Sequence, residues 1–357
     1  MPRPAGGDAE AAARAYCHEQ LASLGFDVVE RPFTYSTIPG RWATSGAGIL
    51  SFASLGAAAL LGRSGRPGFA AALLMAVLFL LALGGAWLAR HGTTRLSTGR
   101  ASAVNLEARP APYGQALEPT VWLVAHLDSK SQPVPMLLRA GGITLTGLAW
   151  LAMLVLSIVA MTRGGDAMPW GTLGIVGMLA ALPVAASTVG ARSAGALDNA
   201  SGVASVLAAA ARVPRSLPVG VLLTSAEELG LAGARAWIAS GGAPARACIL
   251  NCDGVDDEGA LVLMYSGRRP AALLDAAASA AHAEGLEARP RRLLTGVLVD
   301  AVAFADAGHQ ALTVSRGTPR TLARIHRPSD DLAHLAGTGV AEAARLLAAL
   351  AIHQAER

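Results

Sequence analysis

The sequence predicts an α/β fold: a mostly parallel, mixed sheet sandwiched by helices, with two inserted transmembrane α-helical hairpins. Strand-like apolar segments alternate with helix-like ones, which is typical of a largely parallel sheet covered on both faces. Four uncharged apolar runs are each close to the roughly 20 residues that cross a bilayer as a helix. Charged residues make up only 15% of the 357 residues, against about 25% in soluble globular proteins.

The alternating segments can be followed along the chain. We expect helices at 8–25, 199–212, 228–240, 270–285 and 338–355, and strands at 26–35, 120–126, 219–225, 247–253 and 311–317. In a sheet of this kind, functional residues lie at the carboxyl ends of the strands.

The apolar runs form two pairs. Runs 44–62 and 68–89 are separated by RSGRP, and runs 141–161 and 170–190 by TRGGDAMP. We therefore expect two transmembrane hairpins, at 44–90 and 136–191. The α/β domain would then consist of 1–43, 91–135 and 192–357. Four buried helices of a soluble protein are the alternative, which the fourfold recurrence of uncharged runs disfavours.

Composition excludes other classes of protein. The net charge is +4 and no Lys/Arg run is present, so we expect no nucleic-acid partner. The cysteines, Cys17, Cys248 and Cys252, are odd in number and irregularly spaced, which argues against a disulfide framework and fits a reduced compartment. We expect no cleavable signal peptide, because no basic segment precedes an apolar core near residue 1.

Polar side chains follow the predicted strands in order. His126 and Asp128 end one strand, the pair Glu227-Glu228 follows another, and Asp253 ends a third. A glycine-rich turn delivers Asp198, and a late loop carries His326. Imidazole and carboxylate groups suit Zn²⁺. Two zinc ions that share a bridging carboxylate need about five side chains, and the adjacent Glu227 is then free to act as a base.

Each of these residues also has a structural interpretation. Asp198 is suited to cap a helix, the glutamates to complement a helix dipole, and His126 to lie at the surface. His309 and His334 compete with His326 for the last ligand position. For all the structural interpretations to hold together, five independent coincidences would have to occur in the same order along the chain.

Five motifs carry a resemblance to a known family: AHLDS, GALDNASGV, SAEELGLAGA, NCDG and IHRPSDD. In this order they resemble the di-zinc aminopeptidase metallopeptidase family, which includes bacterial leucyl aminopeptidases and has glutamate carboxypeptidase and the transferrin receptor as wider relatives. The resemblance covers the chain outside the apolar inserts and implies a sheet of the zinc-exopeptidase type.

The resemblance also implies roles for these residues. Asp198 would bridge two Zn²⁺ ions, Glu228 and His326 would complete one site, and His126 and Asp253 would complete the other. Glu227 would be the general base acting on a metal-bridging water.

Two further residues receive roles. Asp128 would orient His126 and fix its tautomer. Asp300 resembles a residue of the family that lines the substrate pocket, but Val299 and Ala301 replace its polar neighbours.

These observations predict a membrane-embedded zinc aminopeptidase that hydrolyses N-terminal peptide bonds of peptides or proteins. The alternatives are another zinc amide hydrolase on the same scaffold, such as a carboxypeptidase or a deacylase, and a non-catalytic membrane scaffold or receptor. Because both inserts begin and end on the α/β domain, we expect the site to lie near the bilayer and the substrates to be membrane-bound.

Basic residues near the apolar runs predict the orientation. Seven flank the α/β side and three lie in the hairpin turns: Arg41, Arg90, Arg95, Arg100, Lys130, Arg139 and Arg192 against Arg63, Arg66 and Arg163. This distribution favours a bacterial inner or plasma membrane with a cytoplasmic catalytic domain.

Overall fold

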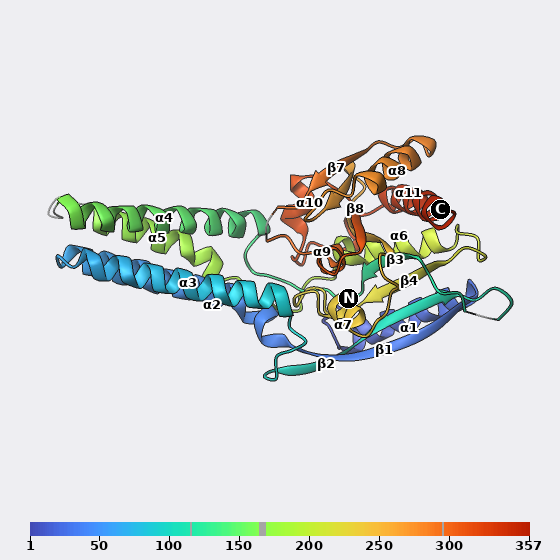
Figure 1. Cartoon of the computed structure of the whole chain (residues 1–357), viewed down its shortest axis with the longest axis horizontal. Coiled ribbons are helices and arrows are strands. Elements are labelled where there is room, and N and C mark those ends of the chain that lie inside the picture. Colours follow the sequence, from blue (N-terminus) through green and yellow to red (C-terminus); the bar gives the residue numbers. More distant parts are fainter. Residues whose placement is uncertain (115, 164–168, 295) are drawn as a thin grey trace. The chain divides into compact units, whose positions relative to one another are not determined.

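The computed structural model describes residues 1–114, 116–163, 169–294 and 296–357. The chain divides into two compact units. The first unit consists of Met1–Thr37, Thr93–Ser131 and Ala191–Arg357, and the second of Ile38–Gly92 and Gln132–Gly190. The chain therefore leaves the first unit twice and returns to it twice (Figure 1).

An eight-stranded sheet forms the centre of the first unit, in the order β1-β2-β4-β3-β5-β8-β6-β7. The strands are β1 (Phe26–Ser36), β2 (Arg100–Pro110), β3 (Val121–His126), β4 (Val219–Thr224), β5 (Cys248–Val255), β6 (Ala260–Tyr265), β7 (Ala288–Arg292) and β8 (Gln310–Gly317). The central strands β4, β3, β5 and β8 run parallel. β1 and β2 join antiparallel at one side, and β6 pairs antiparallel with β8 at the other. The predicted mixed α/β fold is confirmed.

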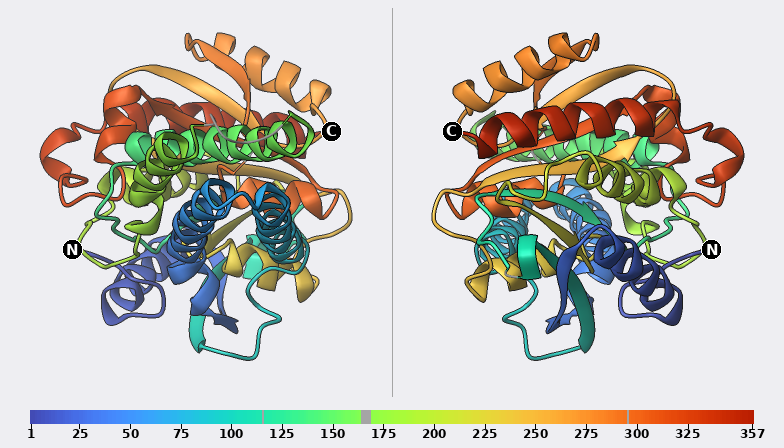
Figure 2. Two further views of the ribbon diagram at one scale, coloured as in Figure 1. Left: turned by 90° about the vertical axis from the view of Figure 1, so that its left-hand side faces the viewer. Right: turned by 90° about the vertical axis from the view of Figure 1, so that its right-hand side faces the viewer.

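Helices cover both faces of this sheet (Figure 2). One face carries α1 (Asp8–Ser23), α6 (Ser201–Ala210), α8 (Ala271–Ala283) and α11 (Thr338–Ala355). The other face carries α7 (Ala232–Ala239) and α9 (Asp300–Asp306). The remaining helical segments of this unit are α10 (Pro319–Arg324) and the short turns η1 (Pro112–Gly114), η2 (Ala196–Ala200) and η3 (Leu332–His334).

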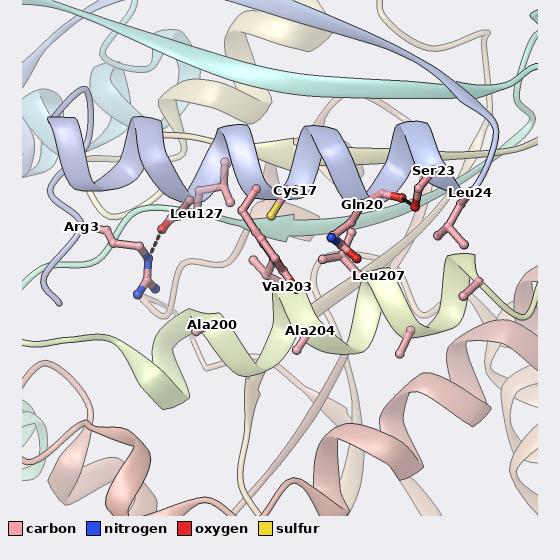
Figure 3. Close-up of a pocket in the computed structure, with 14 residues that line it drawn as sticks. Arg3, Cys17, Gln20, Ser23, Leu24, Leu127, Ala200, Val203, Ala204 and Leu207 are labelled. Carbon is pink, nitrogen blue, oxygen red and sulfur yellow. Dashed lines mark hydrogen bonds between the residues drawn. The ribbon is translucent and has the colours of Figure 1, made fainter.

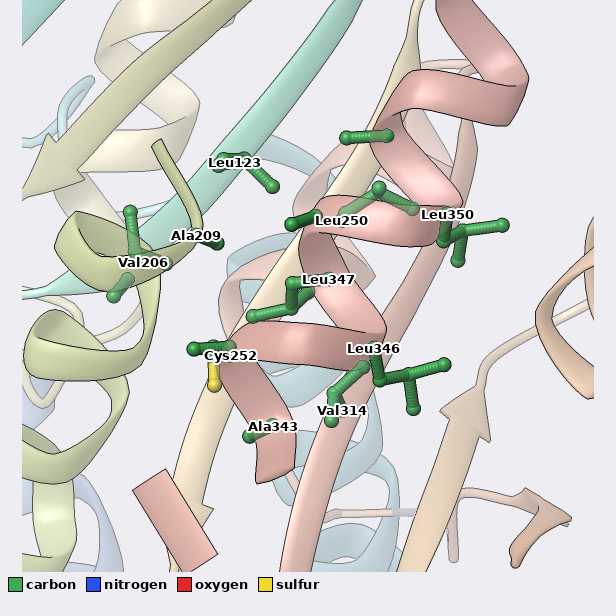
Figure 4. Packing of buried hydrophobic residues seen from close by; sticks show 14 of the residues in the cluster. Leu123, Val206, Ala209, Leu250, Cys252, Val314, Ala343, Leu346, Leu347 and Leu350 are labelled. Carbon is green, nitrogen blue, oxygen red and sulfur yellow. The ribbon is translucent and has the colours of Figure 1, made fainter. Parts of the chain in front are cut away.

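Alternation along β3 divides the core into two clusters. Leu123 faces α6 and α11, where it belongs to the same cluster as Leu250 and Leu347 (Figure 4). Trp122 faces the opposite way and meets Trp237 edge-on, with ring centroids 4.8 Å apart. Because successive side chains of a strand point to opposite faces, a strand covered on both faces is apolar throughout. This explains the uninterrupted apolar run in the sequence.

The helix expected at 228–240 was wrong in its start. α7 begins at Ala232, and Glu228 lies in the preceding loop. Gly230 and Leu231 both have positive φ angles, which a right-handed helix does not allow. Strands β2, β6 and β7 and helices α9 and α10 were not predicted. The sequence of β7, ARPRR, is mostly exposed and has no apolar alternation.

Four helices form the second unit: α2 (Thr37–Arg63), α3 (Pro67–His91), α4 (Met136–Arg163) and α5 (Trp170–Ala185). Small residues allow them to pack closely. A side chain at Gly62 would overlap the ring of Trp170, and one at Gly174 would overlap Ala59. Close approach at small residues is typical of helices that associate in membranes.

Three of these helices, α2, α3 and α4, are long and apolar enough to cross a membrane. The fourth run, expected at 170–190, forms a helix of only 16 residues, with Pro183 inside it, that ends at Ala185. Proline removes a backbone donor and hinders continuation of a helix. Within the described residues, three of the four expected spans are therefore long enough to cross a membrane.

Asp257, just after β5, anchors the start of α11. Its carboxylate accepts hydrogen bonds from the backbone N–H groups of Ala336, Gly337 (3.2 Å) and Gly339 (2.8 Å) and from the hydroxyl of Thr338 (2.9 Å). These bonds favour the charged form and lower the pKa of Asp257 to about 2, although its partial burial acts in the opposite direction.

We expect Asp257→Ala to destabilise the first unit by about 0.5–2 kcal/mol, as loss of a helix cap does. Because the folded pKa lies below the unfolded value, this contribution is complete above about pH 4 and is lost as the pH falls toward 2. The measurement is the unfolding midpoint of both chains between pH 3 and 7, with the exposed Asp275→Ala as control. An equal difference at every pH would contradict the electrostatic part of this explanation.

Candidate metal centre

Strand β3 ends at His126, and the loop that follows it carries Asp128. Nδ1 of His126 lies 3.0 Å from the backbone carbonyl oxygen of Asp128 and 3.6 Å from its Oδ1. The Asp128 carboxylate instead accepts the backbone N–H groups of Glu227 (3.1 Å) and Glu228 (3.2 Å). Asp128 therefore ties the loop after β3 to the loop after β4, while its main chain orients the imidazole.

The loop after β4 turns sharply to present the two glutamates. Ala226 has a φ of 56°, in the left-handed region that non-glycine residues rarely adopt. The turn is held by Asn105, whose Oδ1 accepts the N–H of Ser225 (3.0 Å) and whose Nδ2 donates to the carbonyl of Gly233 (2.9 Å). Such backbone conformations cluster at functional sites.

Asp198 lies in η2, before α6, and its peptide bond to Asn199 is cis. The carboxylate of Asp330 accepts the N–H groups of Leu197 (2.6 Å) and Asp198 (3.3 Å). Asn199 donates from Nδ2 to the carbonyl of Cys252 (2.9 Å), next to Asp253. The Asp198 turn is therefore bonded both to the late histidine loop and to the end of β5.

His326 follows α10 and also has a positive φ, of 64°. Asp256, three residues after Asp253, holds α10 in place. Its Oδ2 accepts hydrogen bonds from the hydroxyl of Thr321 (2.5 Å) and the guanidinium of Arg324 (2.6 Å). The segment that ends β5 thus also positions the last histidine.

Side chains meet here in two groups that share Asp198. They come from the end of β3, the Asp198 turn, the loop after β4, strand β5 and the loop after α10. In one group, Nε2 of His126 lies 3.0 Å from Oδ1 of Asp198 and 3.7 Å from Oδ1 of Asp253. In the other, Nε2 of His326 lies 3.0 Å from Oδ2 of Asp198 and 3.1 Å from Oε1 of Glu228.

Within each group, the ligand atoms lie within 4.8 Å of one another. Glu227 lies beside the groups but belongs to neither, with Oε2 3.9 Å from Nε2 of His126.

Burial and charge act strongly on these residues. Burial raises the pKa of Glu228, but the charges of His326 and Lys130 outweigh it and hold the pKa at about 2. Burial raises the pKa of Glu227 well above its usual value; His126 opposes this rise, and the neighbouring Glu228 reinforces it. Repulsion between buried carboxylates of this kind is relieved by a bound cation.

The donor set fits a metal ion. Nε2 of His126, Nε2 of His326 and Oε1 of Glu228 are buried and, within the described part of the chain, have no partner with hydrogen-bond geometry. Such groups are costly unless something binds them. Imidazole nitrogen and carboxylate oxygen in this number are ligands that zinc takes in proteins.

The structure separates His326 from its two competitors. His309 lies after α9 with its ring against Phe304, at a centroid distance of 6.1 Å. His334 lies on the exposed turn η3. Neither belongs to the two groups found among the described residues.

Asp300, the first residue of α9, is 1% exposed. It accepts a hydrogen bond on Oδ2 from Thr224 at the end of β4, while its Oδ1 has no partner in the described ranges. Burial, which is the largest cause, raises the pKa of Asp300 to about 7.

Lys130 was not predicted as part of the site. Its Nζ lies 2.6 Å from Oε2 of Glu228, so that one oxygen of Glu228 faces the lysine and the other faces His326. One feature of the sequence sets Lys130 apart: it is the only lysine among the 29 lysine and arginine residues. Asn199 and Asp330 lie within the motifs GALDNASGV and IHRPSDD but were assigned no role, because their contacts are with backbone groups of distant residues.

An apolar groove of about 560 Å³ lies between α1 and α6 (Figure 3). It is lined by side chains such as Cys17, Val203 and Leu207, and by none of the metal-site residues. Arg3 stands at one end of it (Figure 3). The titratable side chains that line the groove are those of Arg3, Tyr16 and Cys17, and burial raises the pKa of the Cys17 thiol to about 11.

The comparisons agree with this geometry. Residues 108–351 match the sequence profile of peptidase family M28. No curated protein sequence matches the chain.

Three solved structures have a similar fold. The aminopeptidase of Aneurinibacillus sp. strain AM-1 is 14% identical, with a TM-score of 0.54 over 99% of this chain and 90% of that chain. BSAP, a zinc aminopeptidase of Bacillus subtilis, is 14% identical, with a TM-score of 0.56 over 99% and 90%. A glutaminyl cyclase of Fimbriiglobus ruber is 16% identical, with a TM-score of 0.51 over 98% and 90%. At such identities, the likeness shows the fold alone.

We expect Gly202→Ala, in the first turn of α6, to disturb the Asp198 turn. An added Cβ would overlap Oδ1 of Asn199 and the carbonyl oxygen of Cys252. Overpacking of this kind costs about 1–3 kcal/mol, although alanine is otherwise the better helix former. The measurements are the thermal midpoint and the zinc content. Gly84→Ala, whose Cβ meets open space, is the matched control. Equal behaviour of the two variants would contradict this role of Gly202.

Proposed function

The chain belongs to peptidase family M28, and from this premise we propose that it is a di-zinc aminopeptidase embedded in a membrane. Family and fold make it a zinc metallopeptidase that acts on peptides. Two of the similar structures belong to bacterial aminopeptidases, which favours cleavage at the N-terminal peptide bond over the other amide hydrolyses.

The observation that carries the proposal is the position of Asp198 between two ligand groups. Asp198 would bridge two zinc ions, with His126 and Asp253 completing one site and Glu228 and His326 the other. When bound, zinc lowers the pKa of water and polarises a carbonyl group.

Glu227 would act as general base. Its carboxylate accepts a proton from the water that attacks the scissile carbonyl carbon, and passes it to the amine nitrogen as the C–N bond breaks. Two features support this role: Glu227 lies beside the ligands without joining either group, and Asp128 holds its backbone N–H. The partnerless Oδ1 of Asp300 supports a place for that residue in the substrate pocket.

We expect the purified chain to contain about two zinc ions and to release N-terminal residues from aminoacyl reporters. Glu227→Gln would lower kcat by about 10²–10⁴-fold, because the base is lost while the ligands stay. The measurements are metal analysis and a panel of reporters, with Glu287→Gln, an exposed glutamate, as control. Two bound zinc ions without aminopeptidase activity would instead favour a carboxypeptidase or a deacylase.

The second unit would lie in the bilayer. In α3, the most apolar stretch has only 17% of its residues buried within the protein, and Phe69, Phe79 and Leu80 are 60–70% exposed. Large apolar surfaces of this kind need a partner, and lipid is the one that uncharged helices of this length suit. α2 with α3, and α4 with α5, would form two hairpins that each return the chain to the same side.

We propose that the first unit faces the cytoplasm, on the excess of basic residues that flank its side of the spans. Labelling of single introduced cysteines measures the orientation of the first unit, because the native Cys17, Cys248 and Cys252 are buried away from the reagent. In intact cells, we expect an impermeant maleimide to label Ser64→Cys, in the turn between α2 and α3.

Ser279→Cys, exposed on α8, serves as the matched reporter for the first unit. It would react only after permeabilisation. The reverse pattern would overturn the proposed orientation.

A further inference from the structure

Arg3 connects the loop that directly follows His126, called here the His126 loop, to the turn that carries Asp198. Its Nε donates to the carbonyl of Leu127 (2.8 Å), directly after His126 (Figure 3). Its Nη1 and Nη2 donate to the carbonyls of Ala194 (2.7 Å) and Gly195 (3.0 Å), in the turn that leads to Asp198. One guanidinium therefore satisfies three carbonyl oxygens on two separate loops.

Main-chain contacts of Arg3 strengthen this connection. The N–H of Ser129 donates to the Arg3 carbonyl (2.8 Å), and the N–H of Arg3 donates to Oγ of Ser129 (2.9 Å). The Ser129 hydroxyl in turn donates to the carbonyl of Ser193 (3.2 Å), on the Asp198 side. The N-terminal segment is thus bonded to both loops through main chain and side chain.

The need for such a connection follows from the sequence. His126 and Asp198 are 72 positions apart, and the intervening chain includes all of α4 and α5. A long connection between two loops does little by itself to hold them together. Metal ligands, in contrast, must be held within about 0.5 Å of their binding geometry.

Arginine suits this position in a way that lysine does not. The planar guanidinium presents a fixed fork of donors, whereas an ammonium group is a compact point charge. Burial disfavours the charged guanidinium and lowers its pKa, and attraction by Asp128, Asp198, Asp330 and Glu10 offsets part of this effect.

We infer that Arg3 is a positioning residue of the metal centre, which sets the separation between the His126 loop and the Asp198 turn and thereby the affinity for zinc. This inference rests on the proposed zinc sites. Since coupling between two equilibria is reciprocal, zinc must also stabilise the contacts of Arg3.

The first test measures zinc affinity of the full chain in detergent, by competition with a chromophoric chelator. Residues that orient metal ligands typically contribute about 10–100-fold to affinity, so we expect a loss in this range for Arg3→Ala. Arg3→Lys would lie between this variant and the unmodified chain, and millimolar guanidinium would restore part of the affinity of Arg3→Ala.

Arg14→Ala is the matched control, because Arg14 pairs with Glu30 (2.8 Å) away from both loops. It would bind zinc as the unmodified chain does.

The second test uses the unmodified chain, and so remains decisive if Arg3→Ala does not fold. We expect removal of zinc by a chelator to speed hydrogen exchange at the amides of residues 127–131 and at the N-terminal segment. Residues 127–131 adjoin His126 and serve as the internal reference for zinc removal. A purely structural role of Arg3 would leave exchange at the N-terminal segment independent of zinc.

Unchanged exchange at the N-terminal segment, or a folded Arg3→Ala chain with unaltered zinc affinity, would overturn the inference. Failure of the unmodified chain to bind zinc would instead overturn the proposed function.

Discussion

Repulsion among buried carboxylates is the constraint on which the site depends. Asp198, Glu227, Glu228 and Asp253 converge with two imidazoles where little solvent screens their charge. The protein offsets part of this repulsion with its own groups, since Lys130 pairs with Glu228. Neighbouring imidazole nitrogens remain buried without a hydrogen-bond partner in the described ranges. A divalent cation resolves both problems, which is why the proposed chemistry follows from the electrostatics.

Sheet topology explains how so many charged groups come together without a charged core. β3, β4 and β5 run parallel, so their carboxyl ends meet at one edge of the sheet. Apolar side chains fill both faces below that edge, as at Leu123 and Trp122. The polar groups are then positioned by backbone hydrogen bonds to Asp128 and Asp330 rather than by packing.

The inserted hairpins place an unusual demand on this arrangement. The second hairpin separates the His126 loop from the Asp198 turn, a connection that is far longer than two neighbouring ligand loops need. In the first unit, Arg3 spans the two loops from a third segment of the chain. The long insert and the short distances at the candidate metal centre thus make opposing demands on the same loops. The hydrogen bonds of Arg3 hold these loops together.

Sequence alone determined the α/β class and the apolar inserts, because strand burial and helix length leave local patterns. Its ordered motifs also named the candidate ligands, which lie together in two groups in the structure. It did not predict where α7 begins, since Leu231 has no sequence feature that marks its left-handed backbone. Tertiary structure decided which groups hold the candidate ligands in place. Arg3, Asp330 and Asn199 act on backbone groups far away in the chain, and a contact with a distant backbone atom imposes no periodicity or spacing on the sequence.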